Sequence, residues 1–142
     1  MAGTDSNIVI HKTFELEYGC YTGPIIGKFL TELRDNKKIM GIRCPECGKV
    51  FCPPVDFCPD CFIAPTDWVE VKDEGVMISH TEVFKDFPGQ PHGAPYVVGL
   101  FKLDGADTPM VHLLFWTTDV FYVKSNMHVK AVWKENREGS IR

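Results

Sequence analysis

The spacing of apolar residues changes along the chain, and each change predicts a different element. Pro24 suits the first turn of a helix, because proline lacks the N–H group that would be unpaired there. The apolar residues behind it recur three to four positions apart, as on one face of a helix, at Ile26, Phe29, Leu30 and Leu33. The pattern ends at Asn36, Lys37 and Lys38, with cations at the negative end of the helix dipole. We interpret residues 1–38 as a lead-in followed by an amphipathic helix.

The apolar stripe of this helix has two interpretations. A stripe of this width usually packs against the core of its own domain. A helix that precedes a small metal module has little core nearby, so the same stripe could instead dock on a partner protein.

From Trp68 onward the period of the apolar positions falls to two, which predicts β-strands. The expected strands are Trp68–Lys72, Val76–Phe84, Tyr96–Leu103, Met110–Thr118 and Met127–Trp133. Turn-forming residues separate them, and Asp104–Asp107 has the composition of a hairpin turn. Short strands with no long helix between them favour a five-stranded OB-fold barrel over residues 65–142, with a sandwich fragment as the alternative.

The segment between these regions, residues 39–64, carries the strongest chemical signal. Two Cys-Pro-x-Cys pairs stand ten residues apart and supply the thiols of Cys44, Cys47, Cys58 and Cys61. Two such pairs form tight turns, called knuckles, that can face each other and place four thiolates in the tetrahedron that zinc prefers. Backbone N–H groups in a knuckle point at the sulfur atoms, and Gly48 permits the left-handed backbone that such a turn needs.

Protein ligands fill all four positions of this expected site, so a zinc ion there would be structural rather than catalytic. Iron is the alternative metal, because the pairs resemble the knuckles of rubredoxin, although the short spacing favours a compact zinc ribbon. Metal binding on the order of 10 kcal/mol would fold a segment that has no core of its own.

The other cysteines and the histidines show no catalytic pattern. Cys52 lies out of register with the knuckles, as a small buried residue would, and Cys20 has no base near it in sequence. His80 and His112 each stand alone in an expected strand, where a packed, hydrogen-bonded side chain is the ordinary explanation. The sequence also contains no phosphate-binding glycine loop, nucleophile elbow or His-Glu-x-x-His motif. We therefore expect a protein that is not catalytic alone.

Composition narrows the class of protein. Of the 142 residues, 44% are apolar and 12% aromatic, enough to bury a core. The formal charge of −4 argues against a large nucleic-acid footprint, which needs clustered lysine and arginine. The sequence shows neither a signal-peptide pattern nor a membrane-spanning apolar run, so we expect a cytoplasmic protein with no membrane association. In that reducing compartment six cysteines are expected to be ligands or buried thiols.

Several segments, in this order, resemble one known family, the zinc-ribbon/OB-fold proteins that accompany thiolases and related acyl-CoA enzymes. The similar segments are Gly27–Arg34, Gly41–Gly48, Pro53-Pro54, Cys58–Cys61, Trp68–Val71, Leu103–Asp107, His112–Leu114, Val129–Trp133 and Arg137–Ile141. Many members have glycine at the position of Asn126. Asparagine also tolerates a left-handed backbone, so the turn is expected to survive.

This resemblance implies a non-catalytic subunit that associates with a thiolase-like or other acyl-CoA enzyme in a hetero-oligomer. It also implies CoA or acyl-CoA as a ligand, which the subunit helps to bind or channel. Arg43 and Lys49 flank the first knuckle and could meet CoA phosphates. Phe87, His92 and Tyr96 surround a loop rich in proline and glycine, where a barrel mouth could stack an adenine or line an acyl channel.

Two other classes of function stay open. Zinc ribbons and OB barrels both occur in proteins that bind single-stranded nucleic acid, and four aromatic residues could stack on bases, namely Phe84, Tyr96, Phe101 and Trp116. The acidic charge weighs against this class. A free-standing enzyme or an iron redox protein is the third class.

Overall fold

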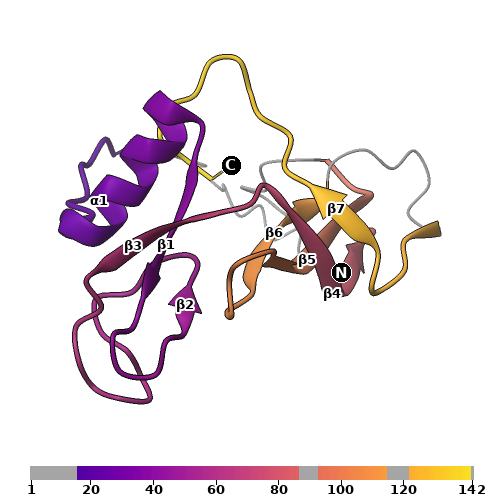
Figure 1. Ribbon diagram of the computed structural model, residues 1–142. Coiled ribbons are helices and arrows are strands. Elements are labelled where there is room, and N and C mark those ends of the chain that lie inside the picture. The colour runs from indigo at the N-terminus through magenta and orange to yellow at the C-terminus, as the bar shows by residue number, and fades with distance from the viewer. Residues whose placement is uncertain (1–15, 87–92, 115–121, 142) are drawn as a thin grey trace, which may run out of the picture.

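The computed structural model describes residues 16–86, 93–114 and 122–141 (Figure 1). Its elements are α1 Gly23–Thr31, the π-helical turn η1 Glu32–Asn36, β1 Ile39–Arg43, β2 Val50–Phe51, β3 Asp67–Val71, β4 Glu74–Val83, β5 Tyr96–Leu103, β6 Met110–Leu114 and β7 His128–Lys130. The strands form two antiparallel sheets, ordered β2-β1-β3 and β6-β5-β4-β7. This confirms the expected mainly β fold with an N-terminal helix. Over the described ranges, no helix has the length and apolar character needed to cross a membrane.

Helix α1 begins beside Pro24, as the sequence predicted, and its apolar stripe faces the protein's own core. Phe29 and Leu33 are buried, with exposed fractions of 2% and 8%, and they belong to one apolar cluster with Ile39 of β1. Lys37 ends the helical segment with a left-handed backbone at φ +55°. Of the two interpretations of the stripe, packing within the chain is therefore confirmed.

The strand expected at Trp68–Lys72 forms as β3, but it belongs to a different sheet from the one predicted. It pairs with β1 along its whole length, from Ile39 opposite Val71 to Arg43 opposite Asp67. Within the described residues, four strands and not five therefore form the second sheet. The reason is physical: a period of two reveals which face of a strand is buried, but not which strand lies beside it.

The closing strand is shorter than the predicted Met127–Trp133. Regular pairing of β7 with β4 ends at Lys130, and one further bond continues the same register, from the N–H of Ala131 to the carbonyl of Asp73 over 2.6 Å. The turn before β7 contains Asn126, the position at which many members of the similar family have glycine and at which a left-handed backbone was expected. Asn126 is left-handed there, with φ +67°, and its N–H donates to the carbonyl of Met77 over 2.7 Å.

The turn between β5 and β6 joins the two sheets, a contact that the sequence did not predict. The N–H of Val50 donates to the carboxylate of Asp107, and the N–H of Asp107 donates to the carbonyl of Val50, both over 2.8 Å. Next to them, the N–H of Cys52 donates to the Oγ1 of Thr108 over 2.9 Å, and this hydroxyl donates to the carbonyl of Cys52 over 3.2 Å. Val50, Cys52 and Leu103 belong to one apolar cluster, so both sheets share a core.

Replacing Thr108 with valine should lower the free energy of unfolding by about 1–3 kcal/mol. Valine has nearly the same shape as threonine but no hydroxyl, so the backbone N–H and carbonyl of Cys52 both lose their hydrogen-bond partner. Thr108→Ser retains the hydroxyl and should be the milder change. Urea unfolding followed by tryptophan fluorescence measures both variants. A valine variant as stable as the parent would contradict this role for the hydroxyl.

Candidate metal centre

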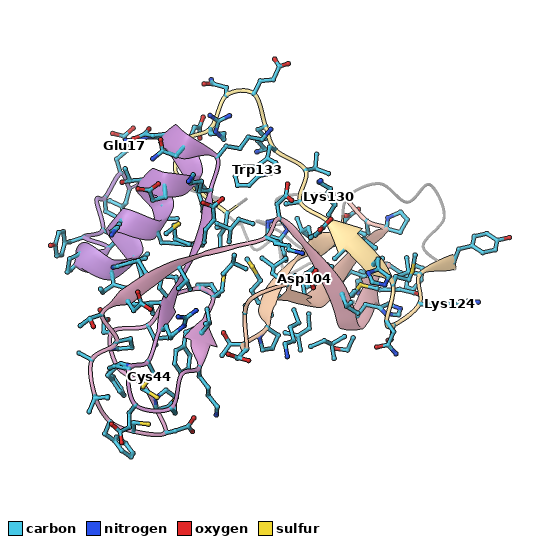
Figure 2. All side chains as sticks on the ribbon, viewed as in Figure 1. Glu17, Cys44, Asp104, Lys124, Lys130 and Trp133 are labelled. Carbon is cyan, nitrogen blue, oxygen red and sulfur yellow. The ribbon has the colours of Figure 1, made fainter. Side chains whose placement is uncertain are left out.

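The four predicted ligand cysteines come together in the structure. Their sulfur atoms all lie within 4.8 Å of one another, and the Sγ atoms of Cys47 and Cys58 are 3.8 Å apart. A tetrahedron with Zn–S distances of about 2.3 Å has edges of about 3.8 Å, so the group fits a tetrahedral zinc ion. Figure 2 shows Cys44 at the end of the three-stranded sheet that lies away from α1. This sheet and its four cysteines are called the ribbon below.

Two turns of the same design hold the sulfur atoms. In the first, the N–H of Gly48 donates to the carbonyl of Cys44 over 3.0 Å, and in the second, the N–H of Phe62 donates to the carbonyl of Cys58 over 2.8 Å. Gly48 and Phe62 thus hold equivalent positions, and both are left-handed, with φ of +75° and +59°. The sequence signalled the first through its glycine. It could not signal the second, because phenylalanine rarely adopts this conformation.

The two Cys-Pro-x-Cys pairs show the same pattern of burial. Cys44 and Cys58, the first cysteine of each pair, have exposed fractions of 0% and pack in an apolar cluster with Ile42 and Phe51. The second cysteine of each pair lies nearer the surface, with Cys47 exposed and Cys61 half-buried. The core of the ribbon is therefore small, and half of its fully buried cluster consists of ligand cysteines.

The electrostatics of the cluster match a cation-binding site. The backbone N–H groups of Cys47 and Glu46 point at the sulfur of Cys44 and lower its pKa to about 7. Burial, followed by the nearby sulfurs, raises the pKa of Cys61 to about 12. Four thiolates this close together repel one another unless a cation lies between them. The donor set therefore suits a divalent, thiophilic metal, and Cys44, Cys47, Cys58 and Cys61 are positioned to bind it.

The remaining two cysteines lie outside this group. Cys52 is buried, with an exposed fraction of 1%, and burial raises the pKa of its thiol to about 11. It therefore stays a neutral thiol in the core, which agrees with its predicted role as a small buried residue. Cys20 is exposed.

The two basic residues expected to meet CoA phosphates lie on the ribbon and are engaged in ion pairs. Arg43 lies 3.4 Å from the carboxylate of Asp67, and Lys49 lies 2.5 Å from that of Asp60. Both pairs are exposed to solvent, where such contacts contribute little and exchange readily. Their role toward CoA stays a prediction.

The three loop residues expected to meet CoA lie elsewhere. Tyr96 begins β5 in the second sheet, opposite Val83 of β4, and is half-buried. Phe87 and His92 lie outside the described residues. The expected aromatic–histidine cluster at a barrel mouth therefore also stays a prediction.

A cavity of about 820 Å³ lies between α1, the second sheet and the C-terminal segment, and the sequence did not predict it. Its walls include the apolar side chains of Phe29, Met110 and Trp133. The basic residues that line it are Arg34, Lys130, Lys134 and Arg137. The C-terminal segment is held against it by His112, whose Nε2 lies 2.6 Å from the carbonyl oxygen of Ile141.

The two strand histidines differ from each other. His112 has partners at both ring nitrogens, since its Nδ1 lies 3.0 Å from the carbonyl oxygen of Leu113, and the expectation of a hydrogen-bonded side chain is confirmed for it. The same expectation is wrong for His80. Its Nδ1 is buried without a hydrogen-bond partner among the described residues, and its Nε2 lies 3.9 Å from the carboxylate of Glu82.

Comparison with known families agrees with this geometry. The rubredoxin-like zinc ribbon domain of ChsH2 matches residues 31–65, and the C-terminal OB-fold domain of ChsH2 matches residues 68–134. Fold and site together define a zinc-ribbon protein with an OB-fold domain. The chain belongs to the ChsH2 family, whose relatives carry the DUF35 domain.

Three relatives illustrate the family. A DUF35 domain-containing scaffold protein of Methanocaldococcus jannaschii is 27% identical over 111 residues, which cover 75% of this chain and 74% of the relative. A DUF35 protein of unknown function from Sulfolobus solfataricus has a solved structure with 31% identity and a TM-score of 0.55, covering 66% of this chain and 69% of that one. A chain of an Ltp2–ChsH2(DUF35) aldolase is 26% identical with a TM-score of 0.61, covering 80% and 87%.

Mutation of a ligand should remove the metal. The purified protein should contain about one zinc ion per chain, and Cys44→Ser should lose it, because three thiolates hold the ion far less tightly than four. Cys52→Ala should keep the metal, since Cys52 lies outside the group. Elemental analysis of the three proteins checks this, and full metal content in Cys44→Ser would contradict the site.

Metal affinity should fall as the pH falls. In the metal-free protein Cys61, with its raised pKa of about 12, carries a proton at neutral pH, and Cys44, with its pKa of about 7, gains one below neutrality. The metal-bound sulfurs carry none, so protons compete with the ion. The stabilisation by metal is therefore present at high pH and lost toward acid. Titration with a chromophoric chelator between about pH 8 and pH 5 should show a loss of about tenfold or more per unit, whereas a flat profile would exclude thiolate ligands.

Proposed function

We propose that this protein is a non-catalytic subunit that binds a thiolase-like or other acyl-CoA enzyme and helps that enzyme to bind or channel acyl-CoA. The observation that carries the proposal is the likeness to the Ltp2–ChsH2(DUF35) aldolase, in which the DUF35 component is named together with an enzyme. The Methanocaldococcus jannaschii relative is named a scaffold protein, which supports the same role. A zinc held by Cys44, Cys47, Cys58 and Cys61 would have a structural role in it, keeping the ribbon rigid.

The cavity supports the acyl-CoA part of the proposal. An acyl-CoA consists of an acyl group, which is apolar, and CoA, which carries phosphates. A binding site for it therefore needs an apolar interior next to cationic side chains. The cavity offers the apolar side chains of Phe29 and Met110 together with the cations of Lys134 and Arg137. Two further groups of residues stay candidates for CoA contacts, namely Arg43 and Lys49 on the ribbon and, separately, Phe87, His92 and Tyr96.

The nucleic-acid alternative is less well supported. Of the aromatic residues expected to stack on bases, Phe101 is buried, with an exposed fraction of 7%, and lies in the apolar cluster of the second sheet. Trp116 lies outside the described residues. The net charge of −4 also opposes binding to a phosphate backbone.

The narrowest form of the proposal takes the chain as the small subunit of benzoylsuccinyl-CoA thiolase, to which its sequence bears a resemblance. In that case the partner would be a thiolase and the acyl group would carry an aromatic ring. Thiolase or CoA-transferase genes beside the gene for this chain would favour this form.

Co-expression with a thiolase-like acyl-CoA enzyme from the same genome tests the proposal. The two chains should elute as one hetero-oligomer, and thioester turnover by the enzyme should fall when this chain is omitted. Isothermal titration should detect acyl-CoA binding to the complex, and Lys134→Gln should weaken it, because the cation lines the cavity. The proposal fails if this chain elutes alone and the enzyme is fully active without it, or if this chain alone turns over a thioester.

A further inference from the structure

The second knuckle carries a phenylalanine where the first carries a glycine. A left-handed backbone is unfavourable for a residue with a Cβ atom, and Phe62 has φ +59°. Its side chain is 80% exposed, so packing within the described structure does not offset this strain. The turn itself needs no side chain at this position, because the equivalent position of the first knuckle is a glycine, Gly48, with φ +75°. Strain that the fold does not require points to a function outside the fold.

A second exposed aromatic side chain stands on the other side of the same knuckle. Phe57 directly precedes Cys58 and is 59% exposed. The N–H of Cys58 donates to the carbonyl of Ile63 over 2.8 Å, which fixes the backbone on both sides of the turn. Aromatic side chains on a rigid turn lose little conformational freedom on binding, which suits them as anchors in a protein interface.

The surroundings of the two rings are acidic. The segment 50–71 contains four carboxylates and neither lysine nor arginine. Three of them, Asp60, Asp67 and Glu70, are paired with Lys49, Arg43 and Lys38, while Asp56, next to Phe57, is exposed. Four thiolates around a divalent metal add further negative charge. A complementary surface would therefore offer an apolar pocket with basic residues at its edge.

We propose that Phe57 and Phe62 anchor the ribbon in an apolar pocket, rimmed by lysine and arginine, on the acyl-CoA enzyme. This inference rests on the proposed function, because that enzyme is the partner. Figure 1 shows the connection between β2 and β3, which carries both residues, at the end of the ribbon away from the four-stranded sheet. A partner can cover this end while the cavity beside α1 stays accessible.

Phe62→Gly separates docking from folding, because glycine removes the ring and also relieves the left-handed strain. The variant should keep its zinc and should unfold at the same or a higher temperature than the parent. Its affinity for the acyl-CoA enzyme that co-purifies with the parent chain should fall about tenfold or more, as for the loss of a buried aromatic anchor. Phe62→Tyr keeps the ring and should bind within a few-fold of the parent.

Tyr122→Ser is the matched control, because Tyr122 is an aromatic residue that is 76% exposed and adjoins Val123 of the second sheet's apolar cluster, and the change should leave the affinity unchanged. Equal affinities of the parent and Phe62→Gly would overturn the inference while leaving the proposed function intact. A parent that does not bind the enzyme would defeat the proposed function itself. If Phe62→Gly instead dissociates a dimer of this chain, the occupant is a second copy and the inference is wrong.

Discussion

Four sulfur atoms within 4.8 Å of one another form the constraint on which the ribbon depends. Burial, and after it the neighbouring sulfurs, raise the pKa of Cys61, so four thiolates at this separation are favourable only with a cation among them. Around them the fully buried cluster adds only Ile42 and Phe51 to the cysteines. Metal binding therefore supplies the free energy that a larger apolar core supplies elsewhere.

The effect of this constraint reaches beyond the ribbon. The first knuckle connects β1 to β2, and β1 in turn aligns β3 and contacts the cluster under α1. The edge of β2 bonds the turn between β5 and β6 through Asp107 and Thr108, which places the second sheet against the same core. Helix and both sheets thus share one apolar cluster, and the cavity lies between α1 and the second sheet.

The sequence predicted those features that a local pattern determines. The cysteine spacing, Gly48 and the start of α1 each have a local cause, and the bounds of Tyr96–Leu103 were predicted as observed. Features that depend on residues distant in sequence were not predictable, among them the sheet partner of β3 and the bonds of Asp107. The backbone of Phe62 escaped prediction for another reason, because its residue type disfavours the conformation that the knuckle imposes.

Hydrogen exchange before and after chelation tests most directly whether the metal holds the ribbon. With zinc bound, the amides of Gly48 and Phe62 should be protected by their bonds to the knuckle carbonyls. A chelator should abolish this protection, whereas the amides between β4 and β5 should exchange much more slowly in both states. Unchanged protection of the knuckle amides after complete removal of the metal would contradict the account.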